Sequence, residues 1–214
     1  MQTDLKQNNT ITLIGKIISD YVFSHEMYGE SFYTFQIETS RLSEATDILP
    51  VTISERLIDK NLFKIDSLIE ITGQIRSYNN IVDGKNHLLL TVFVKDINFN
   101  LDLNKNPNQV VLNGYICKPP VYRKTPFGRE IADVLLAVNR SYNKSDYIPC
   151  IIWGRNAKFA NNLEVGNNIK ISGRMQSRNY QKKLENDEIL EKTAYEISVS
   201  KLEVLEKNLG KNNE

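Results

Sequence analysis

The sequence has few of the residues that form catalytic or metal sites. Its two histidines, His25 and His87, lie in the first half, and its two cysteines, Cys117 and Cys150, lie in the second half without a CxxC spacing. A zinc site or a redox pair needs clustered Cys and His, and a nucleophile motif and a phosphate-binding glycine loop are also missing. We therefore expect no enzyme, no metal and no cofactor, and we expect both cysteines to be buried as small apolar residues.

Long apolar runs are absent as well. No stretch of about 18 apolar residues occurs, which predicts no membrane-spanning helix. The first ten residues, MQTDLKQNNT, carry acids and amides where a signal peptide needs basic and then apolar residues. We therefore expect a cytoplasmic protein without a membrane partner.

The sequence instead contains a long internal repeat. Equivalent residues recur 99 positions apart, or 100 after one insertion, in five pairs: Gly15 and Gly114, Gly29 and Gly128, Arg41 and Arg140, Pro50 and Pro149, Gly73 and Gly173. A period of this length is the size of a small domain. The chain should therefore contain two copies of one fold, which we place at 1–100 and 109–206, with a linker over 101–108 and a polar tail over 207–214.

Each copy has five segments of strand-like composition and one short segment with helical spacing. The first copy has expected strands at 10–23, 31–39, 48–54, 67–78 and 87–99, and an expected helix at 55–63. The second has expected strands at 110–119, 130–140, 147–153, 168–180 and 193–205, and a helix at 155–163. Five strands with a helix between the third and fourth are typical of the OB fold. We predict an all-β protein of two tandem five-stranded OB-fold barrels.

The net charge of +1 conceals a difference between the halves. Residues 1–107 hold ten Lys and Arg against fourteen Asp and Glu, which gives −4, whereas residues 108–214 hold seventeen against twelve, which gives +5. A polyanion should therefore prefer the second half.

Aromatic and cationic residues alternate in the second copy. The aromatic residues are Tyr142, Tyr147, Trp153 and Tyr180, and the cations among them are Arg140, Lys144, Arg155, Arg174, Arg178, Lys182 and Lys183. Single-stranded nucleic acid is bound by this combination, because unpaired bases stack on flat rings and cations contact phosphates. The alternative is that Tyr147 and Trp153 share a core-facing side of their strand, since alternation over 147–153 places them on one face.

Three stretches of the second copy resemble the bacterial single-stranded DNA-binding protein family. They are VLLAVNRSY at 134–142, IPCIIWGRNAKFANNLEVGNNIKISGRMQSRNY at 148–180 and TAYEISVSKLEVL at 193–205. The resemblance implies that Trp153 and Tyr180 stack on bases, that Tyr147 and Tyr142 lie at or near two further stacking positions, and that Arg140, Arg155 and Arg178 contact the backbone. The family's acidic recruiting tail has no counterpart in the ending LEKNLGKNNE, so we do not expect that function.

The first copy matches this family only in the order of its expected strands and helix. Ser54 stands where Trp153 does, and Ile48 stands where Tyr147 does. Its candidate nucleic-acid contacts are Tyr78, Phe32 and Arg41. This copy could equally be a structural barrel that binds DNA weakly or not at all.

The resemblance implies a non-enzymatic protein that coats and protects single-stranded DNA in replication, repair or recombination. The family commonly assembles four barrels, so two chains of two barrels would form a homodimer. Replication or recombination proteins are possible partners. Two other interpretations remain open: an OB-fold adaptor of a primosome, recombination or conjugation complex, and an RNA-binding OB protein.

Overall fold

The structure is a computed structural model that describes residues 8–41, 43–82, 85–101, 106–183 and 189–206, with side chains except at 80–82, 85–87, 182–183 and 206. Within these ranges no helix is long and apolar enough to cross a membrane.

Most of the described chain is β-strand. The first half contains β1 (Asn9–Ile17), β2 (Val22–Met27), β3 (Glu30–Ser40), β4 (Thr46–Ser54), the 3-10 helix η1 (Glu55–Leu57), β5 (Leu68–Val82) and β6 (Lys85–Asn98). The second half contains β7 (Asn108–Ile116), β8 (Val121–Lys124), β9 (Glu130–Arg140), β10 (Lys144–Trp153), α1 (Arg155–Ala160), β11 (Asn168–Lys183) and β12 (Ile189–Glu206).

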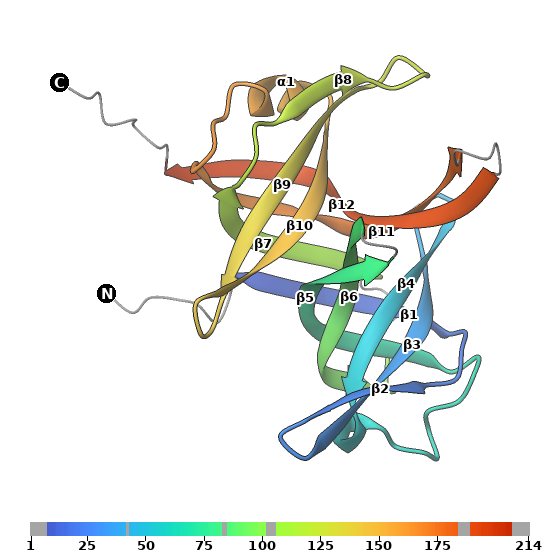
Figure 1. The fold of residues 1–214 in the computed structure, drawn as a ribbon. Coiled ribbons are helices and arrows are strands. Elements are labelled where there is room, and N and C mark those ends of the chain that lie inside the picture. Colours follow the sequence, from blue (N-terminus) through green and yellow to red (C-terminus); the bar gives the residue numbers. More distant parts are fainter. Residues whose placement is uncertain (1–7, 42, 83–84, 102–105, 184–188, 207–214) are drawn as a thin grey trace.

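The strands form two barrels that share one continuous sheet (Figure 1). The strand order is β2-β3-β4-β6-β5-β1-β7-β11-β12-β10-β9-β8, and additional pairings of β1 with β3 and of β7 with β9 close each half on itself. The halves are joined by β1 and β7, which run antiparallel from Asn9 opposite Leu112 to Leu13 opposite Asn108. The predicted fold, two tandem OB barrels, is confirmed.

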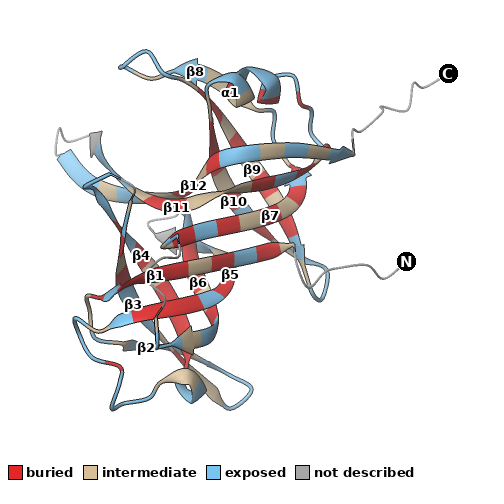
Figure 2. Cartoon of the chain, turned by 180° about the vertical axis from the view of Figure 1, so that it is seen from behind, coloured by how far each residue is buried: buried red, intermediate tan, exposed pale blue. Residues whose placement is uncertain are grey.

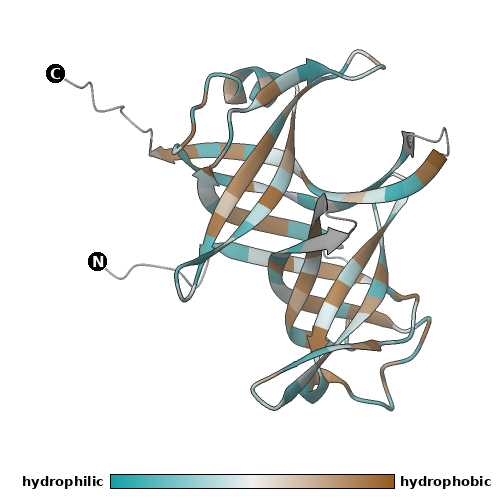
Figure 3. Cartoon of the chain, in the orientation of Figure 1, coloured by the Kyte–Doolittle hydropathy of each residue, from teal (hydrophilic) through white to brown (hydrophobic). Residues whose placement is uncertain are grey.

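The core lies inside each barrel because apolar residues alternate along the strands. In β10, Ile148, Cys150 and Ile152 are buried within the barrel, whereas Tyr147 is exposed and Trp153 is partly exposed on the other face. Buried and apolar bands recur along the central strands (Figures 2 and 3). Alternation with a period of two is therefore the pattern that builds both cores.

The repeated glycines are explained by close backbone contact where each barrel closes. A Cβ atom on Gly15 would overlap the carbonyl oxygen of Glu38 in β3, and one on Gly114 would overlap that of Ala137 in β9. Since β1 must reach β3 and β7 must reach β9 to complete the barrels, only glycine fits at these two points.

Three predictions of secondary structure were wrong. The strand expected over 10–23 is two strands, β1 and β2, and the short β8 of the second half was not predicted at all. The helix expected over 55–63 is only the 3-10 turn η1. After it, the carbonyl of Asp59 accepts the N–H groups of Leu62 and Phe63, and this turn carries Phe63 into the core against Phe35. The packing of Phe63 against Phe35 therefore takes the place of the helix expected here.

Two long hairpins extend from one half to the other. We call β5–β6 the first arm and β11–β12 the second arm; they pair as far as Val82 opposite Lys85 and Lys183 opposite Ile189. The first arm contacts β10 of the second half, and the second arm contacts β4 of the first half. Each half therefore supplies part of the surface of the other.

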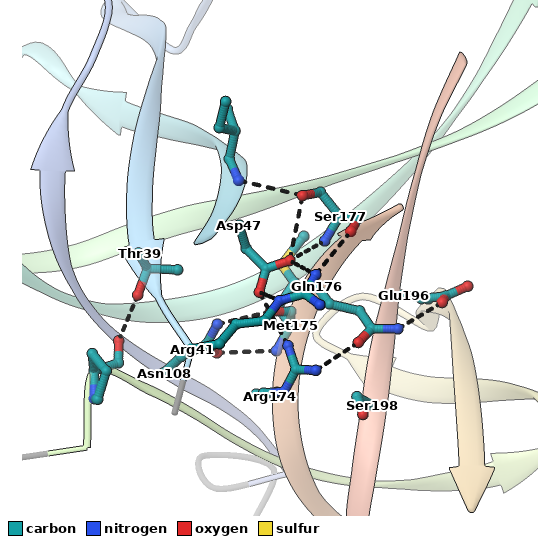
Figure 4. Close-up of polar contacts among 12 residues, drawn as sticks. Thr39, Arg41, Asp47, Asn108, Arg174, Met175, Gln176, Ser177, Glu196 and Ser198 are labelled. Carbon is teal, nitrogen blue, oxygen red and sulfur yellow. Dashed lines mark hydrogen bonds and ion pairs between the residues drawn. The ribbon is translucent and has the colours of Figure 1, made fainter. Parts of the chain in front are cut away.

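The second arm is fixed to the first half by the buried carboxylate of Asp47 (Figure 4). Arg41, from the same half, donates to it at 2.6 and 2.8 Å. From the arm, Arg174 donates at 3.0 Å and the backbone N–H of Ser177 at 2.8 Å. The side chain of Asp47 is only 1% exposed, so these donors replace its water.

The first arm is fixed in the same way by Asp146 of the second half, whose side chain is also 1% exposed. Arg140 of the same half lies at 3.4 Å. From the arm, Arg76 donates at 2.9 Å and the N–H of Ser77 at 2.9 Å. The two carboxylates are 99 residues apart, so the interface repeats with the sequence.

We predict that Asp146→Asn destabilises the protein by about 3 kcal/mol, because it leaves two arginines between the halves without a counter-charge. Asp133→Asn is the matched control: Asp133 also accepts two hydrogen bonds from one arginine, Arg123, but at the surface, where the loss should be about 0–1 kcal/mol. Urea unfolding of both variants measures the difference. Equal losses would contradict a structural role for the buried carboxylate.

Candidate nucleic-acid interface

Trp153 ends β10 on the outer face of the second barrel. Its indole Nε1–H donates to Ser198 Oγ on β12 at 3.0 Å, which fixes the ring while leaving it half-buried. The ring borders a pocket of about 360 Å³ that also contains Arg41 and Arg174. The core is filled instead by three other residues of β10, Ile148, Cys150 and Ile152. The interpretation of Trp153 as a core residue was therefore wrong.

Arg41 and Arg174 are held by Asp47 but remain partly exposed in the Trp153 pocket. The hydrogen bond to Asp47 raises the pKa of Arg41. Burial, together with repulsion by Arg41, lowers the pKa of Arg174 despite the attraction of Asp47. Two guanidinium groups share one carboxylate, so the cluster keeps a net positive charge beside the indole ring.

Tyr147 and Tyr78 each follow a residue that joins β10 to the first arm, Asp146 and Ser77 respectively. The backbone N–H of Tyr147 donates to Ser77 Oγ of the first arm at 2.7 Å, and both tyrosine rings are exposed. Burial raises the pKa of Tyr78, the positive charges of Arg140 and Arg76 lower it, and the negative charge of Asp146 raises it. The backbone of Tyr147 is therefore joined to the first arm at Ser77, the residue before Tyr78.

Arg178 and Tyr180 form a pair on the second arm. The guanidinium of Arg178 lies 5.6 Å from the centre of the Tyr180 ring, and its Nε lies 3.5 Å from Glu196 Oε1. Both side chains are exposed. Stacking against the ring orders the cation in a position from which it can also reach an anion in solution.

The remaining predicted residues of the second half lie at its periphery. Tyr142 projects from the β9–β10 turn and is 94% exposed. Arg155 is exposed at the start of α1. Lys182 and Lys183 end β11, and their side chains lie outside the described ones.

Phe32 differs from the prediction for the first half. Its ring is 5% exposed, with His25 stacked at 5.0 Å on one side and Phe93 at 5.5 Å. It has no open face for a base, so we leave it out of the interface. Phe93 was missed by the sequence analysis, because only the pairing of β4 with β6 brings it here. Arg76 lies 6.0 Å from its ring.

The cysteines lie in apolar surroundings. Cys150 is buried and Cys117 is half-buried, and burial raises the pKa of both thiols. A thiol with a raised pKa is a poor nucleophile and a poor metal ligand. Among the described residues, no group of His, Cys, Asp and Glu could hold a metal ion.

The second half matches characterised proteins in sequence. Residues 107–205 match the Single-strand binding protein family. Over 81 residues the chain is 42% identical to "Single-stranded DNA-binding protein 1" of Staphylococcus aureus (strain COL) and 41% identical to "Single-stranded DNA-binding protein A" of Bacillus subtilis (strain 168). These matches cover 35% of this chain and 48% and 47% of those proteins, so the chain spans about half the length of the curated relatives it matches.

The whole chain matches a solved structure in fold. The wild-type single-stranded DNA binding protein from Thermus aquaticus superposes with a TM-score of 0.73 at 19% identity, over 96% of both chains. The double barrel is thus an arrangement that another protein adopts along its whole length. The sequence match and the fold thus agree in the second half, and residues 107–205 are similar to the single-strand binding protein family.

Proposed function

We propose that this protein binds single-stranded DNA without catalysing a reaction, and so protects exposed strands. The observation that carries the proposal is the outward position of Trp153, fixed by Ser198 beside two partly exposed arginines. A flat ring next to cations fits an unpaired base and its phosphate. The matched relatives are described by their names as single-stranded DNA-binding proteins, which supports the same conclusion.

The other exposed aromatic residues extend this surface. Tyr147, Tyr142 and Tyr180 supply rings, and Arg178 supplies a cation already ordered on Tyr180. Each stacked base contributes about 1–3 kcal/mol, and each neutralised phosphate releases counterions. Binding of this kind depends little on base sequence, as a protein that coats DNA requires.

The proposal extends to assembly and location. Two chains, each with two barrels, would supply the four barrels that the family resemblance implies, so we propose a homodimer. A protein that binds DNA strands exposed during replication, repair or recombination acts in the cytoplasm, where a bacterial chromosome lies.

The first test uses the fluorescence of Trp153, which is the only tryptophan in the chain. We predict that oligo-dT quenches its emission, because a base stacks on the indole ring. Trp153→Ala should weaken binding about 5- to 150-fold, which corresponds to the loss of one stacked base. Anisotropy of labelled oligo-dT measures affinity for the variant, and oligo-U and duplex DNA of the same length test the choice of nucleic acid.

Phe159→Ala provides the matched control for Trp153→Ala. Phe159 is an exposed aromatic residue of α1 in the same half, and it does not belong to the proposed surface. We expect its removal to leave affinity unchanged. Emission that stays constant at saturating oligo-dT would show that Trp153 does not stack on bases. Tighter binding of oligo-U than of oligo-dT would favour the RNA-binding alternative.

The second test uses salt. The logarithm of the association constant should fall linearly with the logarithm of salt concentration, by about 0.7 for each phosphate neutralised. Arg178→Gln should make that slope less steep by about this amount, without creating a sequence preference. Arg56→Gln, which removes an exposed arginine paired with Glu30 in the first half, is the control and should leave the slope unchanged. A wild-type slope near zero would favour the protein adaptor.

A further inference from the structure

A second groove lies between the two halves, at the Asp146 end of their interface. Its volume is about 380 Å³, and its lining includes Met27, Tyr28 and Arg76 from the first half and Arg140, Tyr142 and Lys144 from the second. It is the counterpart of the Trp153 pocket under the repeat, since Arg140 stands 99 residues after Arg41, which lines that pocket. The two grooves have different aromatic residues, since Trp153 lines one and Tyr28 and Tyr142 line the other.

The aromatic residues of this groove are almost wholly in water. Tyr28 forms the tip of the β2–β3 hairpin and is 100% exposed, and Tyr142 forms the tip of the β9–β10 hairpin and is 94% exposed. Both come from turns between strands, but from different halves. Rings held fully in solvent contribute nothing to a core, so both faces of each ring are open to a ligand.

The backbone conformation at both tyrosines is unusual for so large a side chain. Tyr28 has φ of 54° and Tyr142 has φ of 63°, in the left-handed region that a bulky residue rarely adopts. Tyr28 precedes Gly29, with φ of 74°, in a two-residue hairpin loop. Asn is the favoured residue at the first position of such a loop. Each tyrosine therefore stands where another residue would fold more easily, which is a common feature of functional positions.

The charges of the groove complement a phosphate backbone. Arg76 and Arg140 share the single carboxylate of Asp146, which leaves their cluster net positive, and Lys144 is exposed beside them. Cations and open aromatic rings in one groove are the two components of a single-strand binding site.

We propose that this groove is a second binding subsite for single-stranded nucleic acid, formed jointly by the two halves. Bases stack on Tyr28 and Tyr142, and the strand's phosphates are held by Lys144 and by the exposed edges of Arg76 and Arg140. This inference rests on the proposed function and extends it. The first half, despite its charge of −4, then takes part in binding by contributing Tyr28 to a shared groove rather than by forming a complete site of its own.

The test compares two hairpin tips that the repeat makes equivalent. Tyr28→Asn removes the ring and introduces the residue that the turn favours, so we expect unchanged or higher thermal stability and about fivefold or greater loss of affinity for oligo-dT. Phe127→Asn is the matched control. Phe127 lies 99 residues later, before Gly128, and is 93% exposed, but it does not line this groove. Its substitution should leave affinity unchanged.

Two further measurements make the test decisive in the full-length protein. The number of nucleotides of poly-dT bound per chain should fall in Tyr28→Asn, and oligo-dT that carries iododeoxyuridine should form a photo-cross-link to Tyr28. If Trp153→Ala weakens binding but Tyr28→Asn leaves both affinity and nucleotides per chain unchanged, the shared groove is refuted and the proposed function stands. If the wild-type protein does not bind oligo-dT, both are refuted.

Discussion

The arrangement of the whole molecule depends on two buried carboxylates, Asp47 and Asp146. Each carboxylate is almost completely shielded from solvent. It accepts hydrogen bonds from arginines of both halves and from a backbone N–H of the opposite arm. A buried carboxylate that loses these donors is strongly unfavourable, so the two halves are bound to one another by their polar groups as well as by the pairing of β1 with β7. The outer surfaces of the barrels therefore keep a defined relation to each other.

Most arginines near the proposed interface also stabilise the contact between the two halves. Arg41, Arg174 and Arg140 are candidate phosphate contacts by sequence, yet their nearest anions are Asp47 and Asp146. They remain partly exposed, so they can contribute a positive field to a bound strand. Arg178 also lies 3.5 Å from a carboxylate, that of Glu196, but its side chain is 52% exposed and faces the ring of Tyr180, so it is the better candidate for a direct phosphate contact.

The two copies share one backbone arrangement and differ in some of the side chains that it carries. Asn9 of the first copy exchanges hydrogen bonds with the backbone of Ile75, and Asn108 of the second does so with Met175. The arms, in contrast, place their arginine at different positions. Gln74 of the first arm stands where Arg174 stands in the second, yet the first arm still contacts Asp146, through Arg76. Contacts that hold the barrels together are thus maintained, whereas the aromatic residues facing solvent have changed.

The sequence by itself determined the repeat, the two OB barrels and the resemblance of the second copy, because period-two alternation and strand-bending glycines are local signals. It also identified Trp153, Tyr142, Tyr147 and Tyr180 as candidate stacking residues, but left open whether Trp153 and Tyr147 face the core. Only the tertiary structure decided which cations are free, since Arg174 meets Asp47 across 127 residues. It alone buried Phe32 beneath Phe93 and brought Tyr28 into one groove with Tyr142. Pairing between distant strands sets these contacts, and no local pattern encodes them.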